Sequence, residues 1–493
     1  MMKKVGMGAA ALAALVAIGL GVYYFFSAEP TYKNALPADA TVLVCADGKE
    51  INKAVNLEEL ALLIGLNEEE KLKDCGVNLT EKIYAFYRSP ESMGLLACMS
   101  DADKLTAYIT KNGLFRQKVS SIEEKDGFNW LTIQENEAVL IGYDNEKFLA
   151  VGPVSGYNKE EVRQQMIKWM TQGRKESALN TMLYKKLEEK EGLLTYALSM
   201  KAIPEQQMTG YDRQIMEALG GIKELNVAGA VQVDRKKLSC PVEFFTEDNT
   251  INGYWDETDK HLKKLTAVSA EQAPKGLVTW MGMHLEGEPL LKQLRENPDI
   301  RTTLIALNLV ADVDKIISSI NGEIAFAIDS NTNMLLTADV KDETVLKDLP
   351  EWMQPYKQNG WTCKTLSDKE YLLGISVGSM PFPISVGIRG GKLYGATGSL
   401  LADGVGKKTD GNELSDYKSQ IKDNVFFLLF SLPNFMKSDV YKSLTREDMR
   451  MALSLGMVNR IVKDVVLTVS DARNSAFEIY WNEDSDLLKS YLK

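Results

Sequence analysis

Hydrophobic and polar positions alternate in short runs along most of this 493-residue chain, and turn-forming residues separate the runs. Two apolar runs flank Asp-Asn-Glu in residues 138–152 (AVLIGYDNEKFLAVG) and Arg-Gly-Gly in residues 383–397 (PISVGIRGGKLYGAT). This pattern predicts a β-hairpin in each segment. Hydrophobic spacing of three and four residues predicts helices instead, most strongly over 50–64, 101–111, 159–189, 341–354 and 434–456. Runs of strands interrupted by helices predict an α+β fold with antiparallel, meander-like sheets.

The second half of the chain repeats the pattern of the first half. Residues 82–105 align without a gap with residues 323–346, at an offset of 241. The matching residues are Ile83 with Ile324, Ser89 with Ser330, Met93 with Met334, Leu95 with Leu336, Ala97 with Ala338, Asp101 with Asp342, and Leu105 with Leu346. A helix is expected to begin at each matching Asp, because its carboxylate can accept from the free amides of a first helical turn. The other hairpins recur in the same order, which predicts two tandem homologous halves.

The repeat and the N-terminal composition together predict five segments. They are a signal anchor or transmembrane helix over 1–28, a short stalk over 29–35, a first α+β repeat over 36–248, a linker with a short helix over 249–272, and a second α+β repeat over 273–493. A chain of this length exceeds one ordinary hydrophobic core, which agrees with more than one domain.

The N-terminal segment is apolar enough to span a membrane. After Lys3 and Lys4, no charged residue occurs from Val5 to Ser27. Such a run can cross the ~30 Å hydrocarbon layer as a helix, whereas the apolar part of a cleaved signal peptide is usually about 7–15 residues long. The two lysines favour the cytoplasm. We therefore expect a single-pass inner-membrane protein with a cytoplasmic N-terminus and a periplasmic or extracytoplasmic bulk, and a long signal peptide that is still cleaved is the alternative.

Small residues recur four apart on one stripe of this predicted helix, at Ala9, Ala13, Ala17 and Gly21. Small residues at this spacing let two membrane helices approach closely. The stripe is the candidate site for helix packing and a homodimer, although alanine and glycine are also common in export segments.

Charge and cysteine content exclude several classes of protein. The net charge is −11, and no cluster of Lys and Arg is dense enough to follow a phosphate backbone, so nucleic acid is not an expected partner. The five cysteines are scattered without a C-x-x-C pair, which excludes a zinc ribbon and a dense disulfide framework. Whether any two of them pair is left open.

Catalytic and metal-binding motifs fail when their context is considered. Residues 374–378 read G-x-S-x-G around Ser376, but both histidines, His261 and His284, precede it and a further strand is expected to follow. The two histidines make no zinc motif. The sequence therefore predicts no catalytic residue, no metal site and no cofactor. Aromatic residues gather in a polar context only at residues 350–361, where Trp352, Tyr356 and Trp361 are the candidate contact surface.

The chain resembles an uncharacterised family of exported envelope proteins of Gram-negative gut anaerobes. The resemblance rests on ALPADATVLVCADGKEI (35–51) and on KIYAFYR and MGLLACMSDADKLTAYI (82–88 and 93–109). It implies an exported α+β protein and no particular reaction. The chain lacks the lipid-accepting cysteine near residue 20 that many such proteins have, which favours the inner-membrane anchor.

Three functions remain after these exclusions. The first is a non-catalytic binding or scaffold protein of the cell envelope, whose ligand or protein partner is unknown. The second is an envelope hydrolase with carboxylates assembled from distant positions. The third is a subunit of an envelope complex, which would expose a large apolar patch.

Overall fold

The computed structural model of the chain separates into two compact units, Met1–Ala228 and Gly229–Lys493. The structure describes residues 31–54, 75–88, 92–111, 119–133, 138–202, 225–247, 252–296, 298–309, 311–377, 380–397, 404–447 and 449–482. Ala9, Ala13, Ala17, Gly21 and the rest of the predicted anchor lie outside the described residues. Within the described residues, every helix is too short or too polar to cross a membrane.

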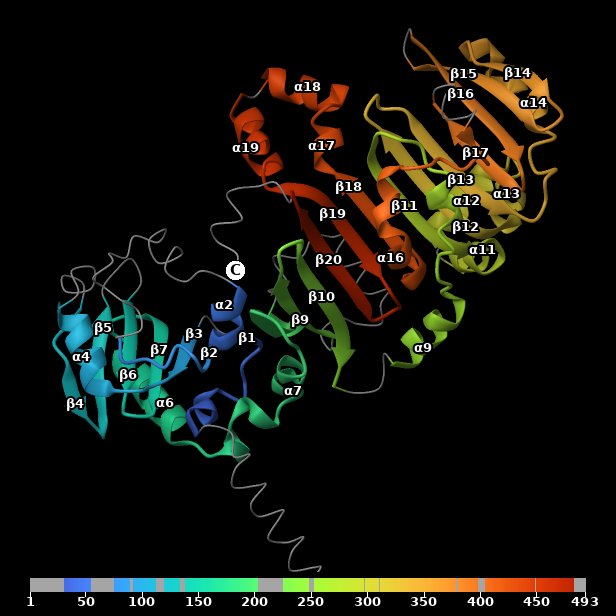
Figure 1. The fold of residues 1–493 in the computed structure, drawn as a ribbon. Helices are drawn as coiled ribbons and strands as arrows, with labels where there is room; N and C mark the ends of the chain where they lie inside the picture. The colour runs from blue at the N-terminus through green and yellow to red at the C-terminus, as the bar shows by residue number, and fades with distance from the viewer. Residues whose placement is uncertain are drawn as a thin grey trace, which may run out of the picture. The chain divides into compact units, whose positions relative to one another are not determined.

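Unit 1 contains one antiparallel sheet. Its strands are β1 (Val42–Asp47), β2 (Lys82–Arg88), β3 (Ser92–Cys98), β4 (Glu123–Lys125), β5 (Phe128–Ile133), β6 (Ala138–Tyr143), β7 (Lys147–Val154) and β8 (Leu194–Ser199). Hydrogen bonding gives the order β4-β5-β6-β7-β3-β2-β1-β8 (Figure 1). The next strand, β9 (Leu225–Val233), contains the boundary between the units.

Helices cover parts of both faces of the unit 1 sheet. They are η1 (Thr31–Ala35), α2 (Gly48–Ala54), α4 (Ala102–Lys111), α6 (Lys159–Thr171), η3 (Arg174–Glu176), η4 (Ala178–Asn180), α7 (Met182–Glu188) and η5 (Met200–Ala202). Trp169 of α6 packs edge-on against Phe86 of β2 at 5.7 Å, and Tyr184 of α7 lies 6.2 Å from Tyr84 of β2. Both strand residues are buried, so α6 and α7 bury alternate residues of the central strands. Residues 102–111 of α4 pack against Ile141 and Tyr143 of β6, on the face opposite Tyr84 and Phe86 of β2.

Unit 2 contains a larger antiparallel sheet. Its strands are β10 (Lys237–Thr246), β11 (Leu277–Glu286), β12 (Ile320–Asp329), β13 (Met334–Val340), β14 (Thr362–Ser367), β15 (Glu370–Val377), β16 (Met380–Arg389), β17 (Lys392–Ala396), β18 (Phe426–Ser431), β19 (Val462–Val469) and β20 (Asn474–Trp481). Their order is β14-β15-β16-β17-β13-β12-β11-β18-β19-β20-β10 (Figure 1). From β14 to β18 this order corresponds strand by strand to that of unit 1.

The core of unit 2 also lies between the sheet and its helices. The helices are α9 (Asn252–His261), α10 (Val268–Glu271), α11 (Gly287–Glu296), α12 (Pro298–Asn308), α13 (Val313–Ser319), α14 (Leu349–Trp352), η8 (Gln354–Asn359), η9 (Glu413–Tyr417), α16 (Lys418–Asp423), α17 (Leu432–Phe435), α18 (Asp439–Glu447) and α19 (Met449–Asn459). Tyr417 and Ile421 belong to one buried cluster with Trp280, Phe427 and Val466 of the strands. Thus η9 and α16 close this face of the sheet.

The α+β class, the antiparallel sheets and both quoted hairpins are confirmed. Several predicted helices are wrong in extent. The segment 159–189 breaks after Thr171, and Thr181 begins α7 as a cap whose hydroxyl accepts from the Tyr184 amide over 3.2 Å. The segment 434–456 falls on three helices, α17, α18 and α19. Of 50–64, residues 50–54 belong to α2 and the remainder lies outside the described residues.

The two matching aspartates behave differently. Asp101 accepts from the Lys104 amide over 3.0 Å and precedes α4, as predicted. Asp342 does not begin a helix, because its carboxylate accepts from the amide and hydroxyl of Thr344 at 2.8 and 2.7 Å. These contacts form a local turn that competes with helix, so only Leu349–Trp352 of the predicted helix 341–354 forms as α14.

Candidate functional site

Each sheet has a second face of which one part is buried, under α4 in unit 1 and under residues 345–353 in unit 2, and the other part has partly exposed side chains. In unit 2 the register of the strands from β10 to β13 defines this face. Met281 of β11, for example, lies opposite Leu428 of β18 and Phe326 of β12. We name this surface the outer face of unit 2. Its residues are Leu238, Cys240, Phe477, Ile479, Val465, Leu467, Phe426, Leu428, Met281, Met283, Ile324, Phe326, Met334 and Leu336.

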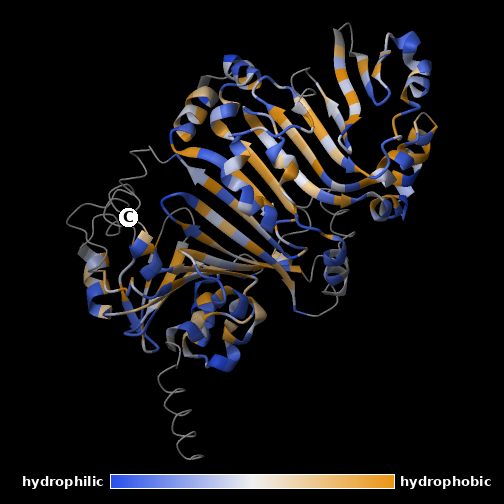
Figure 2. Cartoon of the chain, turned by 45° about the vertical axis from the view of Figure 1, so that its right-hand side comes forward, coloured by the Kyte–Doolittle hydropathy of each residue, from blue (hydrophilic) through white to orange (hydrophobic). Residues whose placement is uncertain are grey.

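The residues named for the outer face of unit 2 are all apolar, and the hydroxyl residues Thr279 and Ser475 lie at its borders on the same face. Leu336 is 50% exposed, whereas the neighbouring Leu335, which points to the covered face, is 6% exposed. Figure 2 shows how hydrophobic residues recur along the strands. Completely burying one Leu or Met side chain stabilises a complex by about 1.5–3 kcal/mol. Because contiguous apolar patches of this kind mark interaction sites, this face is the candidate functional site.

Unit 1 has an outer face of the same kind. Its residues are Val42, Val44, Ile83, Ala85, Tyr87, Met93, Leu95, Leu194, Tyr196 and Leu198, in register across β8, β1, β2 and β3. Met93 and Leu95 are 56% and 42% exposed, and their matching residues in unit 2, Met334 and Leu336, are 38% and 50% exposed. The same positions of the repeated pattern are therefore exposed in both units.

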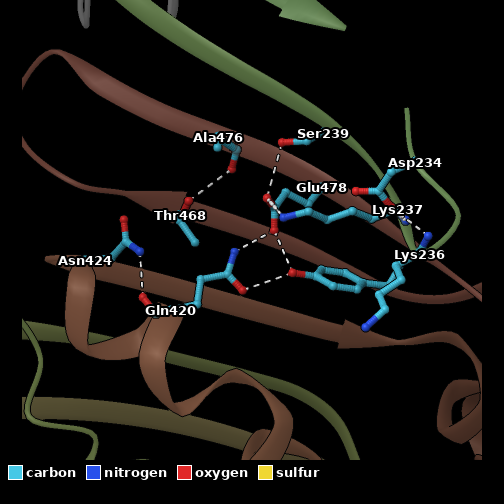
Figure 3. Close-up of polar contacts among 10 residues, drawn as sticks. Asp234, Lys236, Lys237, Ser239, Gln420, Asn424, Thr468, Ala476 and Glu478 are labelled. Atoms are coloured by element: carbon cyan, nitrogen blue, oxygen red, sulfur yellow. Dashed lines mark hydrogen bonds and ion pairs between the residues drawn. The ribbon is translucent and has the colours of Figure 1, made fainter. Parts of the chain in front are cut away.

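A polar cluster lies in unit 2 around the buried carboxylate of Glu478 (Figure 3). Lys237 Nζ and Ser239 Oγ donate to Oε1 over 2.6 and 3.2 Å. Gln420 Nε2 and Tyr480 OH donate to Oε2 over 2.5 and 2.9 Å. Burial opposes ionisation of Glu478, but the hydrogen bonds from Lys237, Gln420 and Tyr480 outweigh burial and hold its pKa below the usual value. Donors occupy both oxygens, which indicates a structural role.

Two other buried carboxylates are satisfied in the same way. Glu188 accepts from Lys82 Nζ and Tyr84 OH, each over 2.9 Å. Glu323 accepts from the Ser269 amide over 3.1 Å and from the Thr266 hydroxyl over 2.5 Å. In both, burial opposes ionisation and the donors outweigh it, so the pKa lies below the usual value. Both carboxylates are therefore ionised at neutral pH, with donors of the protein on their oxygens.

The aromatic residues proposed as a contact surface are only partly brought together. Tyr356 and Trp361 stack at 5.0 Å with an angle of 25° between the rings. Trp352 lies on α14, and Trp361 packs against the buried cluster that contains Tyr371. All three side chains are half-buried. A role for them in binding stays a prediction.

The residues of the rejected motifs have ordinary positions. Ser376 lies within the strand β15, paired with Pro381 of β16, rather than at a strand-to-helix turn. No disulfide joins any two of the five cysteines, all of which lie among the described residues. Within the described ranges, no three of the side chains that commonly ligate metals lie close enough together to hold an ion.

The outer faces were not predicted, although the sequence carries a signal for them. The strand segments VLVCAD (42–47), LVTWMGMHLE (277–286) and FFLLFS (426–431) have apolar residues at consecutive positions. Strands that are apolar on both sides are typical of sheets buried on both faces. Here helices cover one face of these three strands, and on the second face they cover only strands elsewhere in each sheet, such as β5–β7 and β15–β17. The apolar second face of these three strands is the unexplained one.

Comparisons with known proteins place the chain in a family without assigning it a function. Crystal form IV of TP0453 is similar at 10% identity, over 45% of this chain and 83% of that chain, with a TM-score of 0.28. Crystal form III is similar at 8% identity, over 48% and 89%, with a TM-score of 0.27. No curated protein matches. The family described as a domain of unknown function (DUF4836) matches residues 66–472. The chain therefore belongs to the DUF4836 family.

Proposed function

We propose that this protein is a non-catalytic binding protein, anchored in a membrane, whose outer faces bind the acyl chains of lipids. The observation that carries this proposal is the outer face of unit 2, which is apolar across neighbouring strands and partly exposed. Protein interfaces combine apolar area with a polar rim, hydrogen bonds and arginine. A surface composed mainly of Met, Leu, Ile, Val and Phe suits hydrocarbon better, and methionine adapts to flexible chains.

The proposed location rests on the N-terminal composition. The uncharged run from Val5 to Ser27, preceded by Lys3 and Lys4, supports a single-pass inner-membrane anchor with the bulk of the chain on the extracytoplasmic side. The four residues between Phe26 and η1 reach at most ~14 Å when extended, so an anchored unit 1 would remain close to lipid. A homodimer through the small-residue stripe remains part of this proposal.

We also propose that residues 36–248 and 273–493 are duplicated halves joined by the linker 249–272. The common strand order supports this duplication. So do Gly48 and Gly287, which directly follow β1 and β11. A Cβ on either would lie within 2 Å of a backbone carbonyl, at 1.9 Å from Leu79 and 1.8 Å from Ile317. A residue with a side chain at either position would therefore force the backbone to shift.

The test is native mass spectrometry of the full-length protein, extracted gently from its membrane, together with displacement of a fluorescent fatty acid. We expect bound species with lipid masses. The double substitution Leu95→Glu and Leu336→Glu would place a carboxylate on each outer face and weaken fatty-acid binding by about tenfold or more, since a desolvated charge costs well over 1.4 kcal/mol.

The matched control is Leu366→Glu, at an equally exposed leucine on β14 outside the outer face. It should bind fatty acid as the wild type does, with both variants checked for an unchanged thermal transition. Failure of the wild type to bind lipid, or equal binding by the double variant, would overturn the proposal. A second protein chain in place of lipid would do so as well and would indicate a complex subunit.

A further inference from the structure

A separate polar pocket lies in unit 2, on the covered side of the sheet. It is bounded by η9, by α17 and by the start of β19, and its volume is about 410 Å³. Its lining includes the side chains of Glu413, Asp416, Ser431, Asn434, Lys463 and Asp464. The pocket is thus rich in carboxylates, unlike the outer faces.

Glu413 has one satisfied and one unsatisfied oxygen. Its Oε1 accepts from the Gly276 amide over 2.9 Å and from Asn434 Nδ2 over 3.0 Å. These two donors hold the carboxylate in place. Its Oε2 is buried and has no hydrogen-bond partner among the described residues. A buried carboxylate oxygen without a donor is unfavourable, so this atom calls for a donor from a bound molecule.

Asp464 supplies a second buried carboxylate. Its Oδ2 accepts from Tyr417 OH over 2.8 Å, and Lys463 Nζ lies 3.8 Å from the same oxygen. Burial raises the pKa of Asp464, and the negative charge of Glu413 raises it further. The hydrogen bonds from Tyr417 and Ser431 and the charge of Lys463 lower the pKa but offset only part of this increase.

The single ammonium group in the lining does not balance the carboxylates. Lys463 is shared between Asp464 and the exposed Asp416, whose Oδ2 is 3.5 Å from Nζ. Glu413 receives only neutral donors. The pocket therefore favours a cation over a neutral or anionic ligand.

Unit 1 lacks these acids at the corresponding positions, an argument that rests on the proposed duplication. Asn412 Nδ2 donates to the carbonyls of Ala270 and Ala273 over 2.8 and 3.0 Å. Gln172 Nε2 likewise donates to the carbonyls of Asn34 and Leu36 over 2.7 and 3.0 Å. The residue after each amide is Glu413 in unit 2 and Gly173 in unit 1.

The second acid differs in the same way. Asp464 is buried near the start of β19, and the buried polar residue near the start of β9 is Asn226. Two residues further on, Val466 and Ala228 both point into the core and are fully buried. Under the proposed duplication, unit 1 therefore has a glycine and an amide where unit 2 has the two acids.

We propose that this pocket binds a primary ammonium group, which donates to Glu413 Oε2 and lies within the field of Asp464. Three N–H donors on one cation suit a carboxylate oxygen that lacks a partner. The ammonium could belong to a free small amine or to an ethanolamine lipid headgroup, which carry the same chemistry.

The test is calorimetric titration of the full-length protein with ethanolamine, and with choline as a cation that has no N–H donor. We expect ethanolamine to bind and choline to bind at least about tenfold more weakly, since a charge-assisted hydrogen bond exceeds 1.4 kcal/mol. Glu413→Gln keeps an oxygen for the Gly276 amide and should lower ethanolamine affinity by a similar factor. Asp464→Asn copies the Asn226 side chain and serves as the second variant.

Glu351→Gln, at an exposed acid on α14, is the matched control and should bind ethanolamine unchanged. Absence of ethanolamine binding, equal affinity for choline, or unchanged affinity in both pocket variants would overturn the proposal. Flotation with vesicles of phosphatidylethanolamine or phosphatidylcholine distinguishes the sources: selective retention by the former indicates a headgroup, and free ethanolamine binding without it indicates a soluble amine. The Leu95→Glu, Leu336→Glu protein should still bind ethanolamine, so this result is independent of acyl-chain binding.

Discussion

Substitution of Lys237 by Met tests the energetics of the polar cluster around Glu478. Lys237 Nζ lies 2.6 Å from Glu478 Oε1, and the Glu478 side chain is 7% exposed. Met keeps much of the aliphatic stem but removes the charged donor. Removing one partner of a fully buried pair costs about 3–5 kcal/mol. In Lys237→Met, Gln420 and Tyr480 still donate to the carboxylate, so the loss is smaller than this. We expect the free energy of unfolding to fall by about 2 kcal/mol, the contribution of one charge-assisted hydrogen bond.

The assay is urea unfolding of the full-length protein at pH 7 and pH 4, followed by tryptophan fluorescence. The pKa of Glu478 is lowered in the folded state, so its stabilisation is present above the unfolded value, about 4.3, and is lost as the pH falls through the folded value. The cost of Lys237→Met should therefore shrink at pH 4.

The neighbouring Lys236 provides a matched control, because its side chain is exposed on the same turn. Lys236→Met should change the free energy of unfolding by less than about 0.5 kcal/mol. Adding Glu478→Gln to Lys237→Met should restore part of the lost stability, since no charge is then left unpaired. A cost for Lys237→Met below about 0.5 kcal/mol at pH 7, or an equal cost at both pH values, would refute the reasoning.

Two further predictions concern backbone contacts and acid stability. Gly287→Ala should destabilise unit 2 by about 3 kcal/mol in thermal unfolding, because the new Cβ would lie 1.8 Å from the Ile317 carbonyl. Gly456→Ala, which meets open space on α19, should instead stabilise it by about 0.5–1 kcal/mol; equal effects would contradict this account. The free energy of unfolding should also fall below about pH 4.5, because the pKa values of Glu188 and Glu478 are lowered in the folded state, and a flat profile between pH 5 and 3 would contradict it.

The local alternation of hydrophobic and polar residues predicted the strands well, because the residues that form each turn lie directly beside the strands that the turn connects. The hairpin 138–152 forms as β6 and β7, with Asp144 Oδ1 accepting from the Glu146 and Lys147 amides over 2.8 and 2.7 Å. Helix extents were harder, since Thr181 and Asp342 each offer a side-chain acceptor that starts or prevents a helix according to its surroundings.

The candidate site could be predicted only in part. The offset of 241 identified Met93, Leu95, Met334 and Leu336 as equivalent, and all four are exposed on outer faces. Their exposure depends on which face the helices cover, which is a long-range property. The pocket could not be predicted from the sequence. Folding brings Glu413 of η9 and Asp464 of β19 to the same pocket, and neither residue lies in a recognisable motif.

The pairing of β10 with β20 has a consequence for biosynthesis and for fragment design. Lys237 and Glu478 are 241 positions apart in the chain. During translation, β10 therefore cannot pair with β20 until nearly the whole protein has been made. An unpaired edge is a site for wrong association, and contacts so distant in sequence form slowly. A fragment starting at residue 273 would lack β10 and leave β20 without this partner. A stable fragment of unit 2 should therefore begin before Lys237.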